Sequence, residues 1–143
     1  MRNRGSLVFA ALAAFGIAGF AEAVAQGRPT PDFAFYRSKV EPIFLTKKDG
    51  FTRCVVCHAE ANNHFNLQKL TPGAAAWTEE QSRKNFEMVV KLVNPGDADT
   101  SRLTMHPLAP EAGGSAYHSG GRQFMNKDDP DWKILVQFVD GAK

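Results

Sequence analysis

Both cysteines of this 143-residue chain lie in one short motif, Cys54-x-x-Cys57, and His58 follows the second directly. Three chemistries use a Cys-x-x-Cys pair: a dithiol redox centre, half of a four-ligand zinc site, and covalent attachment of haem through Cys-x-x-Cys-His. Only the third requires a histidine at the position of His58. Because residues three apart share a face of a helical turn, Cys54 and Cys57 can both reach one porphyrin edge, with His58 as an axial ligand of the iron.

The competing hypotheses for this motif lack partners in the sequence. A structural zinc site takes four ligands, and the chain has no second cysteine pair. Zinc stays open as an alternative, because the two thiolates and His58 could be joined by one of the other histidines, His64, His106 or His118. A thioredoxin-like centre belongs in a βαβ pattern, which is absent here, and a disulfide remains an alternative for an exported protein. We therefore predict one covalently bound haem c with His58 as its proximal ligand.

The amino-terminal segment has the composition of an export signal. Arg2 and Arg4 precede the apolar run Leu7–Phe20, which leads into small residues. This run is short for a transmembrane helix, which needs about 20 apolar residues. We predict a signal peptide over residues 1–25, a mature domain over residues 26–143 and a periplasmic or otherwise exported location; the alternative is an uncleaved anchor.

The size and charge of the mature segment limit its functions. Residues 26–143 have the usual size of one domain. Their formal charge is +1, because two arginines and one glutamate of the full chain, which carries +2, lie before residue 26. Such a balance gives no case for nucleic-acid binding. After signal cleavage we also expect no membrane binding.

Hydrophobic spacing predicts an amino-terminal helix and a central helix. The first covers about residues 33–47, is capped by Asp32, and is kinked or restarted at Pro42, which cannot donate a backbone hydrogen bond. The second follows the capping-box sequence Thr78–Gln81 and ends before Asn94.

A carboxy-terminal helix and two long irregular segments complete the predicted domain. The helix is capped by Asp129, begins with Pro130 and ends at Gly141. Residues 60–77 and 96–124 are too rich in Gly, Pro and polar residues for long regular elements. Since no alternating strand pattern is present, the fold class is predicted to be all-α, with the last helix packed against the first.

Five segments of the mature sequence resemble a known family: "YRSKVEPIF", "RCVVCH", "SRL", "HSGG" and "DPDWKILVQFVDGAK". They are similar to small single-haem cytochromes c, and in particular to cytochrome c domains of planctomycete-type and related bacterial proteins. The resemblance spans most of residues 26–143. It implies a cytochrome c-like fold of three to five helices around one covalently bound haem.

The sixth ligand of the iron has several candidates: Met88, Met105, Met125, His64, His106 and His118. Met88 and Met125 are interpreted as packing residues, and His64 follows His58 too closely to reach the opposite face of a porphyrin.

The two remaining segments are stronger candidates. Met105 and His106 precede a proline, as the distal methionine does in ordinary small cytochromes c. Glycines on both sides of His118 let the backbone approach a flat ring. The resemblance implies an axial role for His118, so we place it first and Met105 or His106 next.

The predicted function is single-electron transfer between a donor and an acceptor redox protein, without conversion of a substrate. The haem would sit in an apolar cradle formed by Phe51, Phe65, Trp77, Phe86 and Leu103. One alternative is a haem c protein with an open sixth site that acts on peroxide or senses a gas. Another is a binding module stabilised by zinc or a disulfide.

Overall fold

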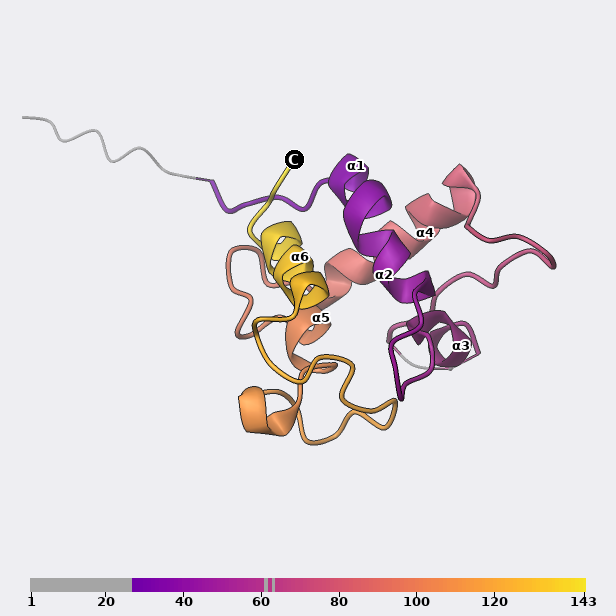
Figure 1. Ribbon diagram of the computed structural model, residues 1–143. Coiled ribbons are helices and arrows are strands. Elements are labelled where there is room, and N and C mark those ends of the chain that lie inside the picture. Colours follow the sequence, from indigo (N-terminus) through magenta and orange to yellow (C-terminus); the bar gives the residue numbers. More distant parts are fainter. Residues whose placement is uncertain (1–26, 61, 63) are drawn as a thin grey trace, which may run out of the picture.

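The computed structural model describes residues 27–60, 62 and 64–143 (Figure 1). The predicted signal peptide therefore lies outside the described residues. The regular elements are, in chain order, α1 (Phe33–Phe35), η1 (Tyr36–Val40), α2 (Glu41–Leu45), α3 (Cys54–His58), α4 (Glu79–Val89), η2 (Val90–Leu92), α5 (Arg102–Met105), η3 (Pro110–Ala112) and α6 (Pro130–Val139). In this part of the chain all of them are helices, which confirms the all-α prediction. None of these helices has the length and apolar character to cross a membrane.

The predicted amino-terminal helix is present but changes its winding before the proline. The Asp32 carboxylate caps α1 by accepting a hydrogen bond from the Phe35 amide at 2.8 Å. Because Pro42 has no amide hydrogen, the α-helical ladder cannot run through it. The chain instead makes the π-helical turn η1 and restarts as α2, with Pro42 in the first turn, where no amide donor is needed. The helix ends at Leu45, two residues before the predicted end.

The other two predicted helices begin at the expected caps. Both hydrogen bonds of the capping box join Thr78 and Gln81 at the start of α4. In α6, the Asp129 side chain accepts from the amides of the first turn. As predicted, α6 packs against the amino-terminal helix, and the rings of Tyr36 and Phe138 meet at a centroid distance of 6.0 Å. Phe138 is fully buried at this contact.

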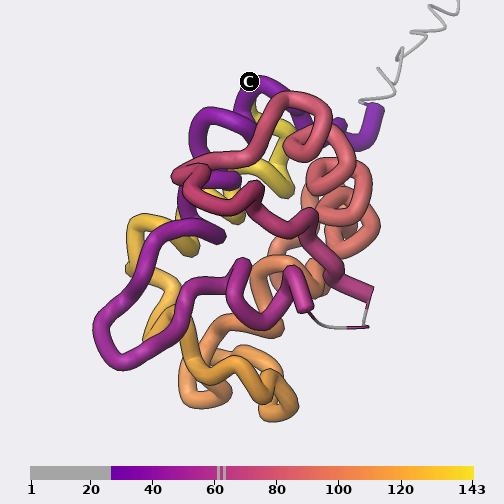
Figure 2. The backbone as a smooth tube through the Cα atoms, turned by 90° about the vertical axis from the view of Figure 1, so that its right-hand side faces the viewer, coloured from indigo at the N-terminus to yellow at the C-terminus, as the bar shows by residue number. Residues whose placement is uncertain are grey.

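The segment 96–124 is more ordered than its composition indicates. It contains the short helices α5 and η3, and an isolated bridge pairs Leu108 with Phe124. The bridge is closed by the Ala109 amide, which donates to the Phe124 carbonyl at 2.8 Å. Tertiary contacts hold α5 in place, because the Trp132 indole donates to the Thr104 carbonyl at 3.2 Å. The stretch after α5 folds at the end of the molecule opposite to the carboxy terminus (Figure 2).

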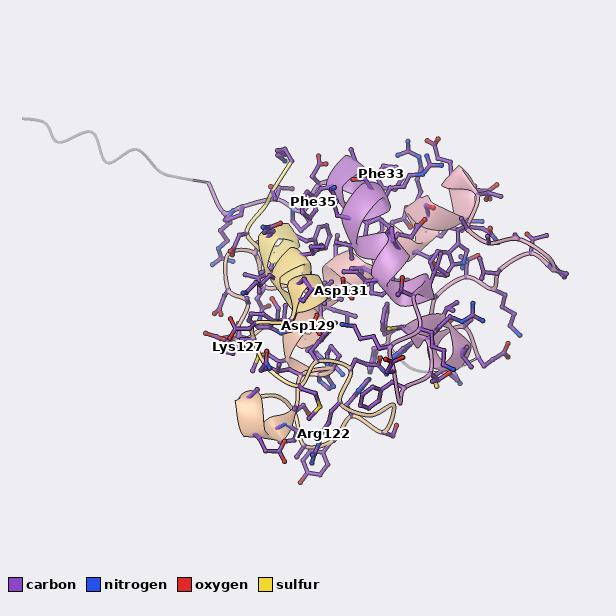
Figure 3. All side chains as sticks on the ribbon, in the orientation of Figure 1. Phe33, Phe35, Arg122, Lys127, Asp129 and Asp131 are labelled. Atoms are coloured by element: carbon purple, nitrogen blue, oxygen red, sulfur yellow. The ribbon has the colours of Figure 1, made fainter. Side chains whose placement is uncertain are left out.

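At the start of α6, the Asp129 side chain makes two interactions that one substitution would remove (Figure 3). Asp129 caps the helix and also binds the Lys48 ammonium at 2.7 Å, in an ion pair whose side chains are 22% exposed. Asp129→Ala removes both interactions, so we expect a loss of about 1–2 kcal/mol in the free energy of unfolding by urea. Asp128→Ala is the control, because its ion pair with Lys133 is largely exposed and worth less than about 0.5 kcal/mol. Equal losses for both variants would contradict this account.

Candidate functional site

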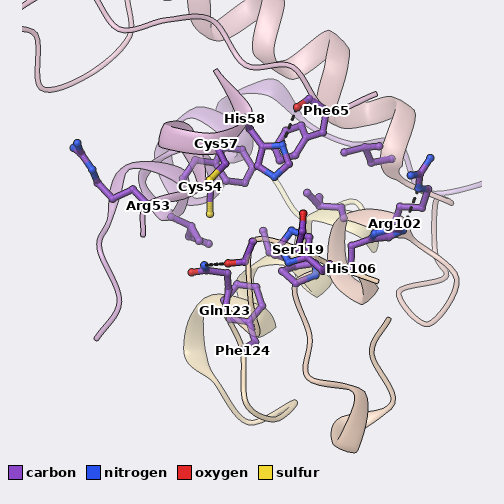
Figure 4. A pocket seen from close by; sticks show the side chains of 18 of the residues that line it. Arg53, Cys54, Cys57, His58, Phe65, Arg102, His106, Ser119, Gln123 and Phe124 are labelled. Carbon is purple, nitrogen blue, oxygen red and sulfur yellow. Dashed lines mark hydrogen bonds between the residues drawn. The ribbon is translucent and has the colours of Figure 1, made fainter. Parts of the chain in front are cut away.

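A cavity of about 390 Å³ lies between α2, α3, α5, α6 and the loop around His118 (Figure 4). This size is within the range of sites that hold cofactors and other small molecules. Its apolar wall includes Ile43, Phe44, Phe65, Leu92, Leu103, Phe124 and Leu135. The described residues that line it include two arginines, Arg53 and Arg102, and no Asp or Glu. The cavity therefore suits a mainly apolar molecule.

The Cys-x-x-Cys-His motif lies on this wall. Residues Cys54–His58 form the helical turn α3, as expected, and both cysteines and His58 line the cavity. Both cysteines are free thiols. Burial raises the pKa of the Cys54 thiol to about 11, so this thiol is protonated at neutral pH. A reactive dithiol requires a thiolate, whereas Cys54 carries a neutral thiol in an apolar wall.

The described residues also offer no site for a bare metal ion. No group of three or more His, Cys, Asp or Glu side chains is arranged there to hold one. A haem iron differs, because the porphyrin nitrogens supply its equatorial ligands and the protein supplies only the axial ones. The donor set required is therefore two thiols and one or two axial side chains.

Two histidines line the cavity in the tautomer that a metal ligand needs. The Nδ1 atom of His58 lies 2.9 Å from the Phe65 carbonyl oxygen, and the Nδ1 atom of His118 lies 2.7 Å from the Gly121 carbonyl oxygen. A carbonyl only accepts, so each Nδ1 carries the hydrogen and each Nε2 keeps a free lone pair. Such a bond behind the ring is typical of ligating histidines.

The electrostatics of His58 agree with a neutral imidazole. Burial lowers the pKa of His58, and the nearby His118 lowers it further, against the opposing hydrogen bond to Phe65. A neutral ring is the form that binds a metal.

The imidazole rings of His58 and His118 are nearly parallel, at 11°, and their centroids are 6.2 Å apart. A metal–imidazole bond is about 2 Å long and a ring nitrogen lies about 1 Å from its centroid, so two imidazoles on opposite sides of one metal have centroids about 6 Å apart. Aromatic rings also pair at about 4.5–7 Å without a metal, so the distance alone does not define a site. The free Nε2 atoms of the two histidines and the two thiols in the same cavity are the further observations that indicate a site.

The alternative sixth ligands are placed less favourably. Met105 does not line the cavity and packs against the hydrophobic core. His106 does line it, but its Nε2 atom accepts from the Arg102 guanidinium at 3.3 Å, so the nitrogen that would bind a metal is engaged. The His106 ring stands nearly perpendicular to that of His118, at 87° and a centroid distance of 6.5 Å.

The apolar cradle differs from the predicted set. Phe65 and Leu103 line the cavity, but Phe51, Trp77 and Phe86 do not. Phe86 packs between α4 and the amino-terminal helix, where its ring contacts Tyr36 at 5.4 Å. The Trp77 indole donates to the Gln68 carbonyl at 2.7 Å, which holds these two parts of the 60–77 loop together. Hydrophobicity alone does not distinguish a residue that faces a cavity from one that faces the core.

Gln123 is a site residue that the sequence analysis missed. Its amide nitrogen lies 3.3 Å from the Thr52 carbonyl and 3.2 Å from the Gly120 carbonyl. Gln123 therefore links the segment just before α3 to the loop that carries His118, although Thr52 and Gln123 are 71 residues apart in the sequence. No sequence signal marks it, because a polar residue in a Gly-rich loop has no periodicity.

Comparison of the chain with protein-family models, curated proteins and solved structures finds no match. The functional conclusion therefore depends on the residues themselves. The cavity brings together Cys54, Cys57, His58, His118 and the alternative candidates His64 and His106, and it leaves out Met88, Met105 and Met125.

Proposed function

We propose that the chain is an exported, periplasmic c-type cytochrome that carries one haem and transfers single electrons between redox proteins. Cys54 and Cys57 hold the haem through thioethers, and His58 and His118 are the axial ligands. The observation that carries this proposal is the pair of nearly parallel imidazoles with free Nε2 atoms, in the cavity that both thiols line. The donor and the acceptor are redox proteins. The chain meets them either as a free carrier or as a subunit of a larger redox complex.

The residues of the chain have distinct roles in this function. The bound haem supplies reversible one-electron chemistry at its iron. The Phe65 and Gly121 carbonyls hold the two imidazoles in a fixed tautomer and orientation, so little rearrangement accompanies a change of charge. The apolar wall would keep water away from the bound haem. Held between His58 and His118, the haem would serve electron transfer and not chemistry on peroxide or a gas.

The helical arrangement supports a cytochrome c-like fold. The contact of α6 with η1 joins the two ends of the domain, and α5 packs against α6 beside the cavity. In this arrangement the helix with the cysteine motif lies next to α2, whose residues Ile43 and Phe44 line the cavity.

The covalent bond is the direct test of the proposed function. We expect the chain, exported in a host with cytochrome maturation, to have the mass of the polypeptide plus one haem and to keep its colour through acid–acetone extraction. The double variant Cys54→Ala, Cys57→Ala should lose all covalent haem, because no sulfur remains to form a thioether.

Val56→Ala is the matched control, since it changes the same turn of α3 at a residue that is 48% exposed and keeps the motif. It should retain one haem per chain. A colourless wild-type protein with the mass of the bare polypeptide would disprove the proposal.

A further inference from the structure

A cluster of buried polar side chains lies outside the cavity, between the amino-terminal helix and α4. Four of its side-chain atoms are buried without a partner in good hydrogen-bond geometry: the Tyr36 hydroxyl, one Glu41 carboxyl oxygen, the Ser82 hydroxyl and the Asn85 amide nitrogen. The exposed fraction is 5% for Glu41 and 0% for the other three residues. Buried polar atoms are rarely left unpaired, and a buried carboxyl group least of all. The proposed electron transfer uses none of these groups, so the cluster needs its own explanation.

Both titratable groups of the cluster, Glu41 and Tyr36, have raised pKa values. Burial raises the pKa of Glu41, opposed by the neighbouring Ser82 hydroxyl and the Arg37 charge. Burial and the adjacent Glu41 charge raise the pKa of Tyr36 far above physiological pH, so Tyr36 stays neutral.

The charges around Glu41 are otherwise fixed. Arg37 is always charged and is itself paired with Glu79 at 3.0 Å. From α4, Ser82 and Asn85 face the cluster, and neither titrates. Because Tyr36 stays neutral, Glu41 is the one of these four side chains whose charge can change.

The position of Glu41 couples it to the cavity. Glu41 is on α2, and Ile43 and Phe44 of the same helix line the cavity. Residues three apart on a helix have Cβ atoms about 5–6 Å apart, so the Glu41 side chain lies next to that of Phe44, which forms one layer of the cavity wall. That layer is aromatic, because Phe44 contacts Phe65 at a centroid distance of 5.4 Å and Phe65 contacts His58 at 4.3 Å. Charges separated by buried apolar groups are screened less than charges in water.

We propose that Glu41 is a redox-linked proton-binding site. The Glu41 carboxylate takes one proton from solvent when an electron from the donor protein lowers the charge in the cavity by one unit. The carboxyl group returns that proton to solvent when the electron leaves to the acceptor. This inference rests on the proposed function and extends it, because the chain then carries a proton together with each electron.

The pH dependence of the midpoint potential tests the proposal. In spectroelectrochemical titrations of the purified holoprotein, the potential should fall as pH rises through the titration of Glu41, because reduction takes up a proton. The limit for one proton per electron is a tenfold change in the equilibrium constant per pH unit, which is about 59 mV. Glu41→Gln keeps the shape of the side chain, removes its titration, and should remove this part of the pH dependence.

Glu87→Gln is the matched control, because it makes the same chemical change at an exposed position of α4. It should leave the pH dependence of the wild type unchanged. The haem propionates also titrate, and the comparison of these two variants separates their effect from that of Glu41. An identical pH dependence in all three proteins would overturn the inference.

A second measurement does not depend on the folding of a variant. Infrared difference spectra of the wild type should show a protonated carboxyl band on reduction, and this band should shift when only glutamate is labelled with ¹³C. The absence of a glutamate-dependent band would overturn the proton site. A protein that carries no covalent haem would overturn the proposed function instead, so the two failures are distinct.

Discussion

Replacing His118 with alanine should change the haem from low-spin to high-spin and allow it to bind one carbon monoxide per haem. The wild type should bind none, because the imidazoles of His58 and His118 occupy both axial positions. In the structure, His118 has a free Nε2 atom and a ring nearly parallel to that of His58 at a centroid distance of 6.2 Å. Its removal opens the side of the cavity opposite His58. Visible and near-infrared absorption, recorded in both oxidation states, measure this change directly.

His106→Ala is the matched control for this experiment. It removes an imidazole from the same cavity, but one whose Nε2 atom already accepts from Arg102. We expect the His106 variant to stay low-spin and to bind no carbon monoxide. The opposite pattern, with low-spin character lost only in the His106 or a Met105→Ala variant, would show that the axial ligand is not His118. The cytochrome proposal would survive that result, but the ligand assignment would not.

Replacing Gly114 with alanine should destabilise the folded protein by about 3 kcal/mol, the upper part of the usual range for overpacking. A Cβ atom at this position would overlap the carbonyl group of Leu108 and crowd its side chain, and Leu108 is only 1% exposed. The Gly114 amide also donates to the Ala109 carbonyl at 3.0 Å, so the backbone cannot move away without loss of that bond. Urea denaturation of the holoprotein, followed by circular dichroism, gives the change in the free energy of unfolding.

Gly113 provides the control because it is the neighbouring glycine with a different constraint. It has a positive φ of 94°, but no atom lies within 4 Å of the position that a Cβ atom would take. Gly113→Ala should therefore cost only the left-handed backbone strain, about 1 kcal/mol. A larger loss for Gly113→Ala than for Gly114→Ala would contradict the close packing between Gly114 and Leu108.

The local elements of this protein were predictable from sequence because their signals are local. Asp32, Thr78 and Asp129 accept hydrogen bonds from the amides that follow them, so each helix start could be found within four residues of sequence. The proline in the amino-terminal helix removes a donor at a known position, and the interruption appears there. The spacing of Cys54, Cys57 and His58 likewise needs only one helical turn, and α3 provides it.

The partner of His58 could not be decided from sequence, because six side chains had the right chemistry for it. The choice among them depends on which side chain the folded protein places in the cavity of His58, and on whether that side chain has a free lone pair there. The structure places His118 there, leaves Met105 outside the cavity, packed against the core, and engages His106 with Arg102. These outcomes depend on contacts over tens of residues, such as the one that Gln123 makes with Thr52.

The sequence by itself therefore determined the helix starts and the cysteine motif, because hydrogen bonds between near neighbours specify them. Tertiary structure alone decided which residues line the cavity and that Glu41 is buried. Sequence patterns favour a glutamate at the surface, since a charged group loses hydration inside a protein. The tertiary packing that brings Glu41 of α2 beside Ser82 of α4 overrides that preference, and so creates a titratable group behind an apolar wall.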